Sequence, residues 1–238
     1  MLKQIHFIYL LIFFIGGCSQ METKAPLIPM EDFMRNPEKS SFQISPNGNY
    51  VAFMKPWKTR MNVFVMDMNT NKEERLTSSE ARGIYGFTWL TDNRIGYIKD
   101  DGGNENMHFY AVNIDGTNEM DLTPFENIQA RIIDDLEDDQ NHVIIGLNKR
   151  NPQIHDPYRV NINDGTMEMI AENPGNISGW GTDHNGKLRI ATTSDGVNTS
   201  LLYRDKESDK FKPILTTDFK VSVTPLFFTF DNKNLFVA

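Results

Sequence analysis

Four histidines outside the apolar N-terminal stretch are the side chains best suited to act as general bases or metal ligands. They are His108, His142, His155 and His184. No two of them have the spacing of a metal-binding motif such as His-Glu-x-x-His. Nor does the sequence contain Gly-x-Ser-x-Gly, which would present a nucleophilic serine on a sharp strand-to-helix turn. We therefore predict no catalytic residue and no cofactor in this chain.

A run of acidic residues from Asp134 to Asp139 (Asp-Asp-Leu-Glu-Asp-Asp) is the only other candidate for a metal site. Several carboxylates together can hold a hard cation such as Ca²⁺, but a calcium loop also needs a glycine at its sharp turn, and this run has none. We interpret it as the edge of a strand followed by a solvated turn, and predict no metal site.

Three charged residues could contact a ligand. Glu105 lies in the polar segment Asp100–Asn106 and could attract an amine, whereas Arg150 and Arg159 could pair with a peptide carboxylate. Exposed loops carry binding residues more often than strands do. The alternative for Glu105 is a Gly-Gly turn capped by Asp and Asn.

The single cysteine, Cys18, suggests a different chemistry. It follows Gly16-Gly17 and an apolar run from Ile5 to Ile15, which is too short to span a bilayer but suits a signal peptide. This arrangement resembles the bacterial lipobox, in which the cysteine is lipidated. We predict a lipoprotein signal peptide at 1–17, a tether at 18–27 and an exported protein anchored to a membrane of the bacterial envelope through Cys18. The alternative is an ordinary signal peptide with an incidental thiol.

Composition excludes some functions. The net charge of −8 disfavours binding to nucleic acid, because the phosphate backbone would be repelled. With Cys18 lipidated, no thiol remains for a disulfide or a thiolate zinc site. Stability must then come from packing.

The elements that position these residues follow a repeat of about 46 residues. Each unit has a second strand after a polar turn, and we expect these strands to begin at Tyr50, Ile95, Val143, Leu188 and Leu235. The ends of the third strands are marked by Asp67, Asn113, Asn161 and Asp205. Tight-turn residues, such as Asp115-Gly116 and Asp164-Gly165, separate strands rich in Val, Ile, Phe and Tyr.

Four short strands per unit and a period in the forties indicate a β-propeller. We predict an all-β fold, an incomplete propeller of four four-stranded blades plus the first half of a fifth. An N-terminal segment spans 28–41, and the blades span about 42–80, 86–124, 130–173, 177–218 and, in part, 223–238. Trp57, Trp89 and Trp180 are predicted to pack within blades rather than to form a binding platform.

The C-terminal residues Leu235–Ala238 fall inside a predicted strand. Because blades are stable when each stacks on the next, we expect the sequence to be part of a longer protein. A ring that borrows a strand from the N-terminus is the alternative.

Two stretches carry a resemblance to a known family: Ile28–Pro37 (IPMEDFMRNP) and Phe42–Phe53 (FQISPNGNYVAF). They resemble the N-terminal region of prolyl oligopeptidase-type (S9 family) serine peptidases, in particular the acylaminoacyl-peptidase and dipeptidyl-peptidase branch. Later segments, such as Lys99–Asn106 and Asn148–Pro152, are also similar.

The resemblance implies a propeller that admits oligopeptides to an α/β-hydrolase domain carrying Ser, Asp and His. This chain would lack that domain and be inactive alone. Its partners would be a peptide substrate and a hydrolase domain in cis. The alternative is a non-enzymatic propeller lipoprotein that binds a protein or a glycan.

Overall fold

The computed structural model describes residues 25–238 and divides the chain into two units after Arg35. In the first unit, the described residues 25–35 include one short helix, α2 (Met30–Met34), which is exposed. The predicted signal peptide and Cys18 lie outside the described residues, and they stay predictions.

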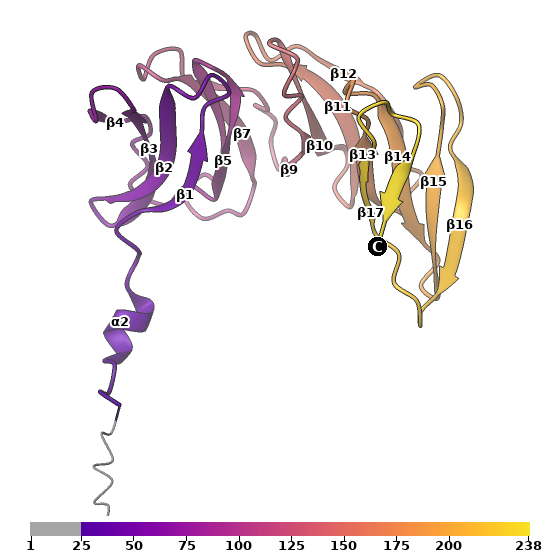
Figure 1. Ribbon diagram of the computed structural model, residues 1–238, viewed down its shortest axis with the longest axis horizontal. Helices are drawn as coiled ribbons and strands as arrows, with labels where there is room; N and C mark the ends of the chain where they lie inside the picture. Colours follow the sequence, from indigo (N-terminus) through magenta and orange to yellow (C-terminus); the bar gives the residue numbers. More distant parts are fainter. Residues whose placement is uncertain (1–24) are drawn as a thin grey trace, which may run out of the picture. The chain divides into compact units, whose positions relative to one another are not determined.

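The second unit, from Asn36 to Ala238, consists of four antiparallel sheets of four strands and one of two strands. In every sheet the strands follow chain order, and each one hydrogen-bonds to the next (Figure 1). The strands are β1 (Ser40–Ile44), β2 (Tyr50–Trp57), β3 (Arg60–Asp67), β4 (Glu73–Arg75), β5 (Gly86–Thr91), β6 (Arg94–Lys99), β7 (His108–Asn113), β8 (Met120–Asp121), β9 (Ala130–Asp134), β10 (His142–Asn151), β11 (Ile154–Asn161), β12 (Met167–Met169), β13 (Ile177–Thr182), β14 (Leu188–Ser194), β15 (Asn198–Tyr203), β16 (Lys212–Asp218), β17 (Pro225–Phe228) and β18 (Leu235–Val237).

These sheets are successive propeller blades, which we number one to five. The predicted all-β class and the repeat of four-stranded units followed by two strands of a fifth are confirmed.

Two strand starts differ from the prediction. The second strands of blades two and three begin at Arg94 and His142, one residue before the predicted Ile95 and Val143. Both polar residues pair across the sheet, Arg94 with Asn113 and His142 with Asn161, so the ladder starts on a polar pair that hydrophobicity does not reveal. The earlier start adds one pair to each ladder and leaves the register of the following residues unchanged.

The third strand of blade four ends at Tyr203, two residues before the predicted Asp205. There the chain turns so that the buried Arg204 can donate from Nε to the Leu188 carbonyl over 2.7 Å.

Hydrophobic side chains from facing blades form the core. One cluster contains Ala52 and Val63 of blade one together with Ile95 and Tyr97 of blade two, all with no exposed surface. A second joins blades two and three, and a smaller one joins blade four to Phe228 of blade five. No cluster among the described residues joins blades three and four, which instead meet through polar contacts such as that of Thr182 with Asp134.

Polar bonds between the blades repeat with the same period. Gln43 Nε2 donates to the Phe87 carbonyl over 2.9 Å, Thr88 Oγ1 donates to Asp135 Oδ2 over 2.8 Å, and Thr182 Oγ1 donates to Asp134 Oδ2. Their sequence separations, 44, 47 and 48 residues, match one blade.

The antiparallel order places alternate turns at opposite ends of the strands. We call the end that carries the β9–β10 and β13–β14 turns the first-turn end. The β6–β7 and β10–β11 loops lie at the other end.

Candidate functional site

A depression of about 680 Å³ lies at the first-turn end of blades three to five. Its walls come from the end of β9, the β9–β10 turn, the end of β13 with its turn, and β17. We call it the acidic depression and define it by residues 133–139, Arg159, 180–186 and 226–228.

The acidic run forms one wall, and Leu136 holds it in place. Leu136 is buried at 5% exposure, and a Cβ at Gly186 would lie 2.5 Å from its Cδ2, so a side chain there would have to displace Leu136. Gly186 also has a φ of +67°, which suits glycine in a tight turn. The Leu136 amide donates to Asp134 Oδ1 over 2.8 Å, which fixes the start of the turn.

The carboxylates of the acidic run differ in their hydrogen-bonding partners. Asp134 and Asp135 accept the cross-blade bonds from Thr182 and Thr88. Asp139 pairs with His142, with 3.0 Å between Oδ2 and Nδ1. Partial burial raises the pKa of Asp139, but hydrogen bonds from the Asn141 amide and from His142 outweigh this and leave that pKa below its usual value. Glu137 and Asp138 remain exposed.

Arg159 lies in the same depression and joins blade three to blade four. Its Nη2 donates to the Gly186 carbonyl over 3.0 Å and to Glu207 Oε1 over 3.3 Å. Glu207 thus already compensates much of the charge of Arg159. The contact of Arg159 with a ligand stays a prediction.

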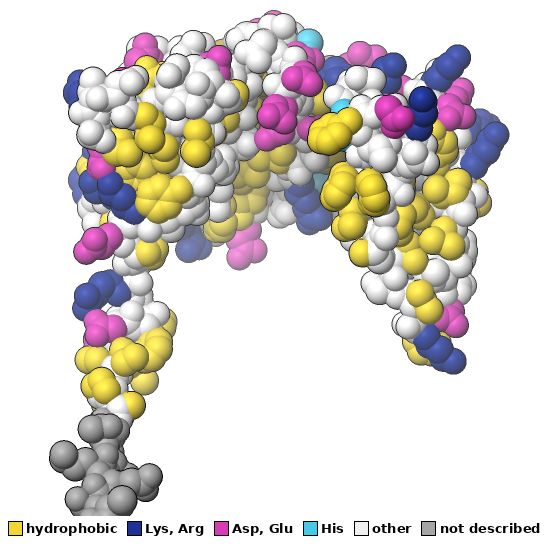
Figure 2. Space-filling view, in the orientation of Figure 1, with side chains coloured by type: hydrophobic (Ala, Val, Ile, Leu, Met, Phe, Trp, Pro, Cys, Tyr) yellow, Lys and Arg dark blue, Asp and Glu magenta, His cyan; other side chains and the backbone are white. Residues whose placement is uncertain are grey.

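The opposite wall is apolar. Trp180 on β13 is half-buried, with its ring 5.7 Å from that of Phe211. Leu226 and Phe227 on β17 are 53% and 60% exposed, and hydrophobic side chains gather over β17 in Figure 2. The predicted packing role holds for Trp89, which is 7% exposed in the core. Trp180 combines packing with a place in the depression.

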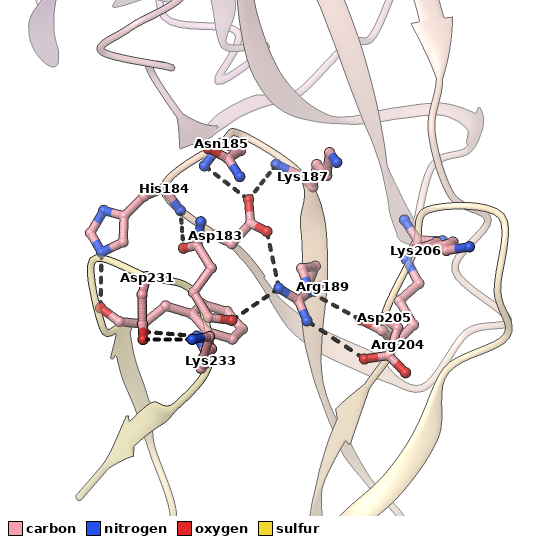
Figure 3. A network of polar contacts seen from close by, with 12 residues as sticks. Asp183, His184, Asn185, Lys187, Arg189, Arg204, Asp205, Lys206, Asp231 and Lys233 are labelled. Atoms are coloured by element: carbon pink, nitrogen blue, oxygen red, sulfur yellow. Dashed lines mark hydrogen bonds and ion pairs between the residues drawn. The ribbon is translucent and has the colours of Figure 1, made fainter.

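A polar network attaches the β17–β18 hairpin to blade four (Figure 3). Asp183 accepts hydrogen bonds from the amides of Asn185 and Lys187 and pairs with Arg189 Nη1 at 3.2 Å. Arg189 Nη1 also donates to the Asn232 carbonyl over 3.2 Å. The network thus orients the hairpin that supplies the apolar wall.

His184, in the same turn, makes two further bonds to the hairpin. Its amide donates to Asn232 Oδ1 over 2.9 Å, and its ring Nε2 lies 2.8 Å from the Phe228 carbonyl. Its ring also stacks on Phe230, with 5.1 Å between centroids.

The other two candidate residues lie at the opposite end of the strands. Glu105 is exposed in the β6–β7 loop with a φ of +61°, and its amide donates to Asp100 Oδ2 over 3.3 Å. Arg150 makes a two-point pair with the buried Asp156, at 2.9 and 3.0 Å. This hydrogen bonding raises the pKa of Arg150 above its usual value. Glu105 and Arg150 therefore do not converge with Arg159, and their predicted roles remain untested.

The described histidines that form side-chain hydrogen bonds pair with carboxylates or a backbone carbonyl. No histidine of this range hydrogen-bonds a serine or threonine hydroxyl; His108, for example, pairs with Asp121 at 2.8 Å. Burial lowers the pKa of His155. In the same range, no three His, Cys, Asp or Glu side chains are grouped to hold a metal ion. Among the helices described there, none has the length and apolar character needed to cross a bilayer.

The sequence did not predict that these residues would come together in one depression. The run at 134–139 was visible, but its interpretation as a solvated turn did not place it opposite Trp180 and β17. The repeat could have indicated these contacts. Thr182 lies about one period after Asp134, and Thr88 about one period before Asp135, so each pair occupies similar positions in neighbouring blades.

The comparisons with known proteins agree with the resemblance drawn from the sequence. No family model matches the chain. Dipeptidyl aminopeptidase BIII of Pseudoxanthomonas mexicana is 30% identical over 216 residues, which cover 88% of this chain and 31% of that protein. A Tricorn-like protease N-terminal subunit of Sulfurisphaera tokodaii is 30% identical over 133 residues, covering 53% of this chain and 63% of that one.

Solved structures show the same fold. The β-propeller domain of the Trilobed protease from Pyrococcus furiosus has a TM-score of 0.52 and 16% identity, over 79% of this chain and 59% of that one. This likeness concerns the fold alone. The sequence relatives are peptidases, and the chain spans only 31% and 63% of the lengths of the two named here.

Proposed function

We propose that this chain, a homologue of part of dipeptidyl aminopeptidase BIII, is the propeller portion of an exported serine peptidase that acts on oligopeptides. The observation that carries the proposal is the 30% identity over 88% of the chain. The propeller would admit and orient peptides for an α/β-hydrolase domain, which supplies the nucleophile. The acidic depression is the site where we expect the propeller to meet them.

The described residues support a role in binding rather than bond cleavage. They offer a depression with carboxylates on one side and Trp180 and Phe227 on the other, but no hydroxyl activated by a histidine. With six carboxylates in its lining, the depression is more polar than the typical apolar ligand pocket.

Export and lipid anchoring at Cys18 form part of the same proposal. They are supported by the apolar run from Ile5 to Ile15 and by the small residues before Cys18. An anchored peptidase would meet peptides outside the cytoplasm.

The test compares two proteins: the 238-residue chain, and the product of the complete open reading frame that contains it. We expect the complete product to react with a fluorophosphonate probe and to cleave oligopeptides faster than folded proteins, whereas the 238-residue chain does neither. Labelling of the short chain, or a complete product that is inert to the probe, would overturn the proposal.

A further inference from the structure

We propose that the outer strand of blade four, β16, is a dimerisation edge, to which β16 of a second copy of this chain adds in antiparallel orientation. A two-fold axis at Leu215 would relate the two copies, and the paired strands would join their fourth blades into one continuous sheet. No residue of β16 lines the acidic depression, so this interface is separate from that site.

Strand length distinguishes β16 from the outer strands of the other three four-stranded blades. β4, β8 and β12 contain three, two and three residues, whereas β16 contains seven. Only β15 pairs with β16, which therefore forms a free edge of its sheet (Figure 1). A free edge presents unpaired backbone N–H and C=O groups, and a long one can accept another strand where a very short one cannot. A neighbouring blade stacks on the face of a sheet, so it leaves this edge accessible.

The side chains at the centre of β16 are apolar. Ile214 and Leu215 are 55% and 43% exposed. Charged side chains commonly protect exposed edges from pairing, and β4 follows this rule, since it consists of Glu-Glu-Arg. The centre of β16 has no such protection. In an antiparallel pair, Ile214 and Leu215 would contact residues of the added strand and lose part of their exposure to water.

Charge complementarity identifies a second copy as the partner and fixes the register. With the axis at Leu215, Lys212 of each copy lies opposite Asp218 of the other, so one ion pair forms at each end of the interface. Both side chains are exposed, and within residues 25–238 neither forms an ion pair. Opposite charges across a pair of strands stabilise it, whereas like charges destabilise it. An axis at Thr216 would instead place Lys212 opposite Lys220.

Pro213 limits the extent of the pairing. Proline has no N–H to donate, and the ladder between β15 and β16 is irregular beside it, where the register shifts between Leu201 and Leu202. The backbone bonds between the two copies would therefore lie around Leu215, with the ion pairs at either end. So short a ladder gives a weak interface. Because both copies use the same edge, the assembly closes as a dimer and does not extend into a filament.

Disulfide trapping tests the position of the axis. The experiment uses the full 238-residue chain with Cys18→Ser, which leaves no other thiol, in mild detergent that shields the apolar N-terminal run. Residues that face each other in an antiparallel pair have Cα atoms about 4.5–5.5 Å apart, which a disulfide can bridge. Leu215→Cys should thus form a covalent dimer under mild oxidation. Met169→Cys is the matched control, because Met169 is 40% exposed on the outer strand β12, and it should stay monomeric.

Charge exchange tests the register. Sedimentation velocity at low salt gives the association constant of the Cys18→Ser chain. Lys212→Asp places like charges at both ends of the interface and should weaken association by roughly three- to thirtyfold, and so should Asp218→Lys. The two substitutions together restore opposite charges and should restore association. Lys206→Asp is the control, because it makes the same change of charge at an exposed lysine of blade four outside β16. Circular dichroism checks that each variant keeps its fold.

A chain that stays monomeric, equal trapping of Leu215→Cys and Met169→Cys, or a double exchange that does not restore association would each overturn the inference. Rescue by the double exchange would support it, because a substitution that only damaged the fold could not be repaired by reversing the opposite charge. The proposed function has its own readout in the fluorophosphonate labelling of the complete product.

Discussion

Asp183 and Arg189 show how single charged residues serve the fold of this propeller. The side chains of this pair are 3% and 11% exposed, so both charges are removed from water and rely on each other and on backbone groups (Figure 3). Breaking one partner of a buried pair leaves the other uncompensated, which costs more than the pair itself contributes.

Asp183→Asn tests this arrangement. Asparagine can still accept the amide hydrogen bonds of the turn, but it no longer neutralises Arg189. We expect a loss of roughly 1–3 kcal/mol in the free energy of unfolding and faster hydrogen exchange in residues 225–237. Asp205→Asn is the control, because Asp205 approaches Arg189 only at 3.7 Å and is 77% exposed. Equal effects of the two substitutions would contradict the proposed role of burial.

Asp195 predicts a pH dependence. The amides of Asn198 and Val197 and the side chain of Asn198 donate to this exposed carboxylate, and they lower its pKa from 3.8 to about 2. A lowered pKa in the folded state means that the bonds stabilise the fold above the unfolded pKa and that this stability is lost as pH falls through the folded pKa. The contribution should thus be complete above about pH 5 and fade between pH 3.8 and about 2.

Urea unfolding between pH 2 and 7 measures this effect. Asp195→Asn should flatten the acid part of the curve. Asp138→Asn, a change at an exposed aspartate of a different turn, serves as the control. If both variants keep the wild-type slope, the loop bonds of Asp195 do not contribute to stability.

At the scale of elements, the close approach of neighbouring strands is set by small residues. Gly96 on β6 lies under the ring of Phe109 on β7, and an added Cβ would overlap that ring and come within 3.1 Å of Leu90. Phe109 is fully buried between blades two and three, so it has little room to move.

Gly96→Ala should therefore destabilise the protein by roughly 1–3 kcal/mol, because overpacking forces neighbouring side chains off their preferred rotamers. Gly86→Ala is the matched control in β5, where an added Cβ meets no atom within 4 Å and the backbone is extended. We expect its free energy of unfolding to stay within about 0.5 kcal/mol of the wild type. A similar loss for both glycines would point to backbone effects instead of packing.

The strands themselves were largely predictable. Turn residues recur at one period, so Tyr50, Leu188 and Leu235 were located as strand starts without error. At Arg94 and His142 the strand starts earlier than predicted, because these polar residues still pair with a residue of the next strand. At Tyr203 the strand ends earlier than predicted, where the next residue, Arg204, hydrogen-bonds to the Leu188 carbonyl. Hydrophobic patterning cannot locate such partners, because they depend on how strands pair.

At the scale of the whole molecule, the candidate site depends on contacts between blades, and this is why the sequence alone did not reveal it. Asp134 and Trp180 are separated by a full repeat and share a depression because β9 and β13 are consecutive first strands. Glu105, Arg150 and Arg159 each looked suitable for binding, yet the meander places the first two at the opposite end from the third. The residue types alone identified candidates for binding, but only the fold shows which of them lie close together.

The proposed lipid anchor leads to a prediction for the whole chain. One acyl chain holds a protein to a membrane only weakly, since each buried CH₂ adds about 0.8 kcal/mol, and stable anchoring needs a second signal. In a bacterial host, the 238-residue chain should incorporate labelled palmitate and sediment with membranes, and Cys18→Ser should abolish both. Adding Met169→Cys to Cys18→Ser supplies an exposed thiol without the preceding Gly16-Gly17 and should not restore the label. An exported wild-type chain that carries no label would instead indicate an ordinary signal peptide, and the propeller would then work unanchored.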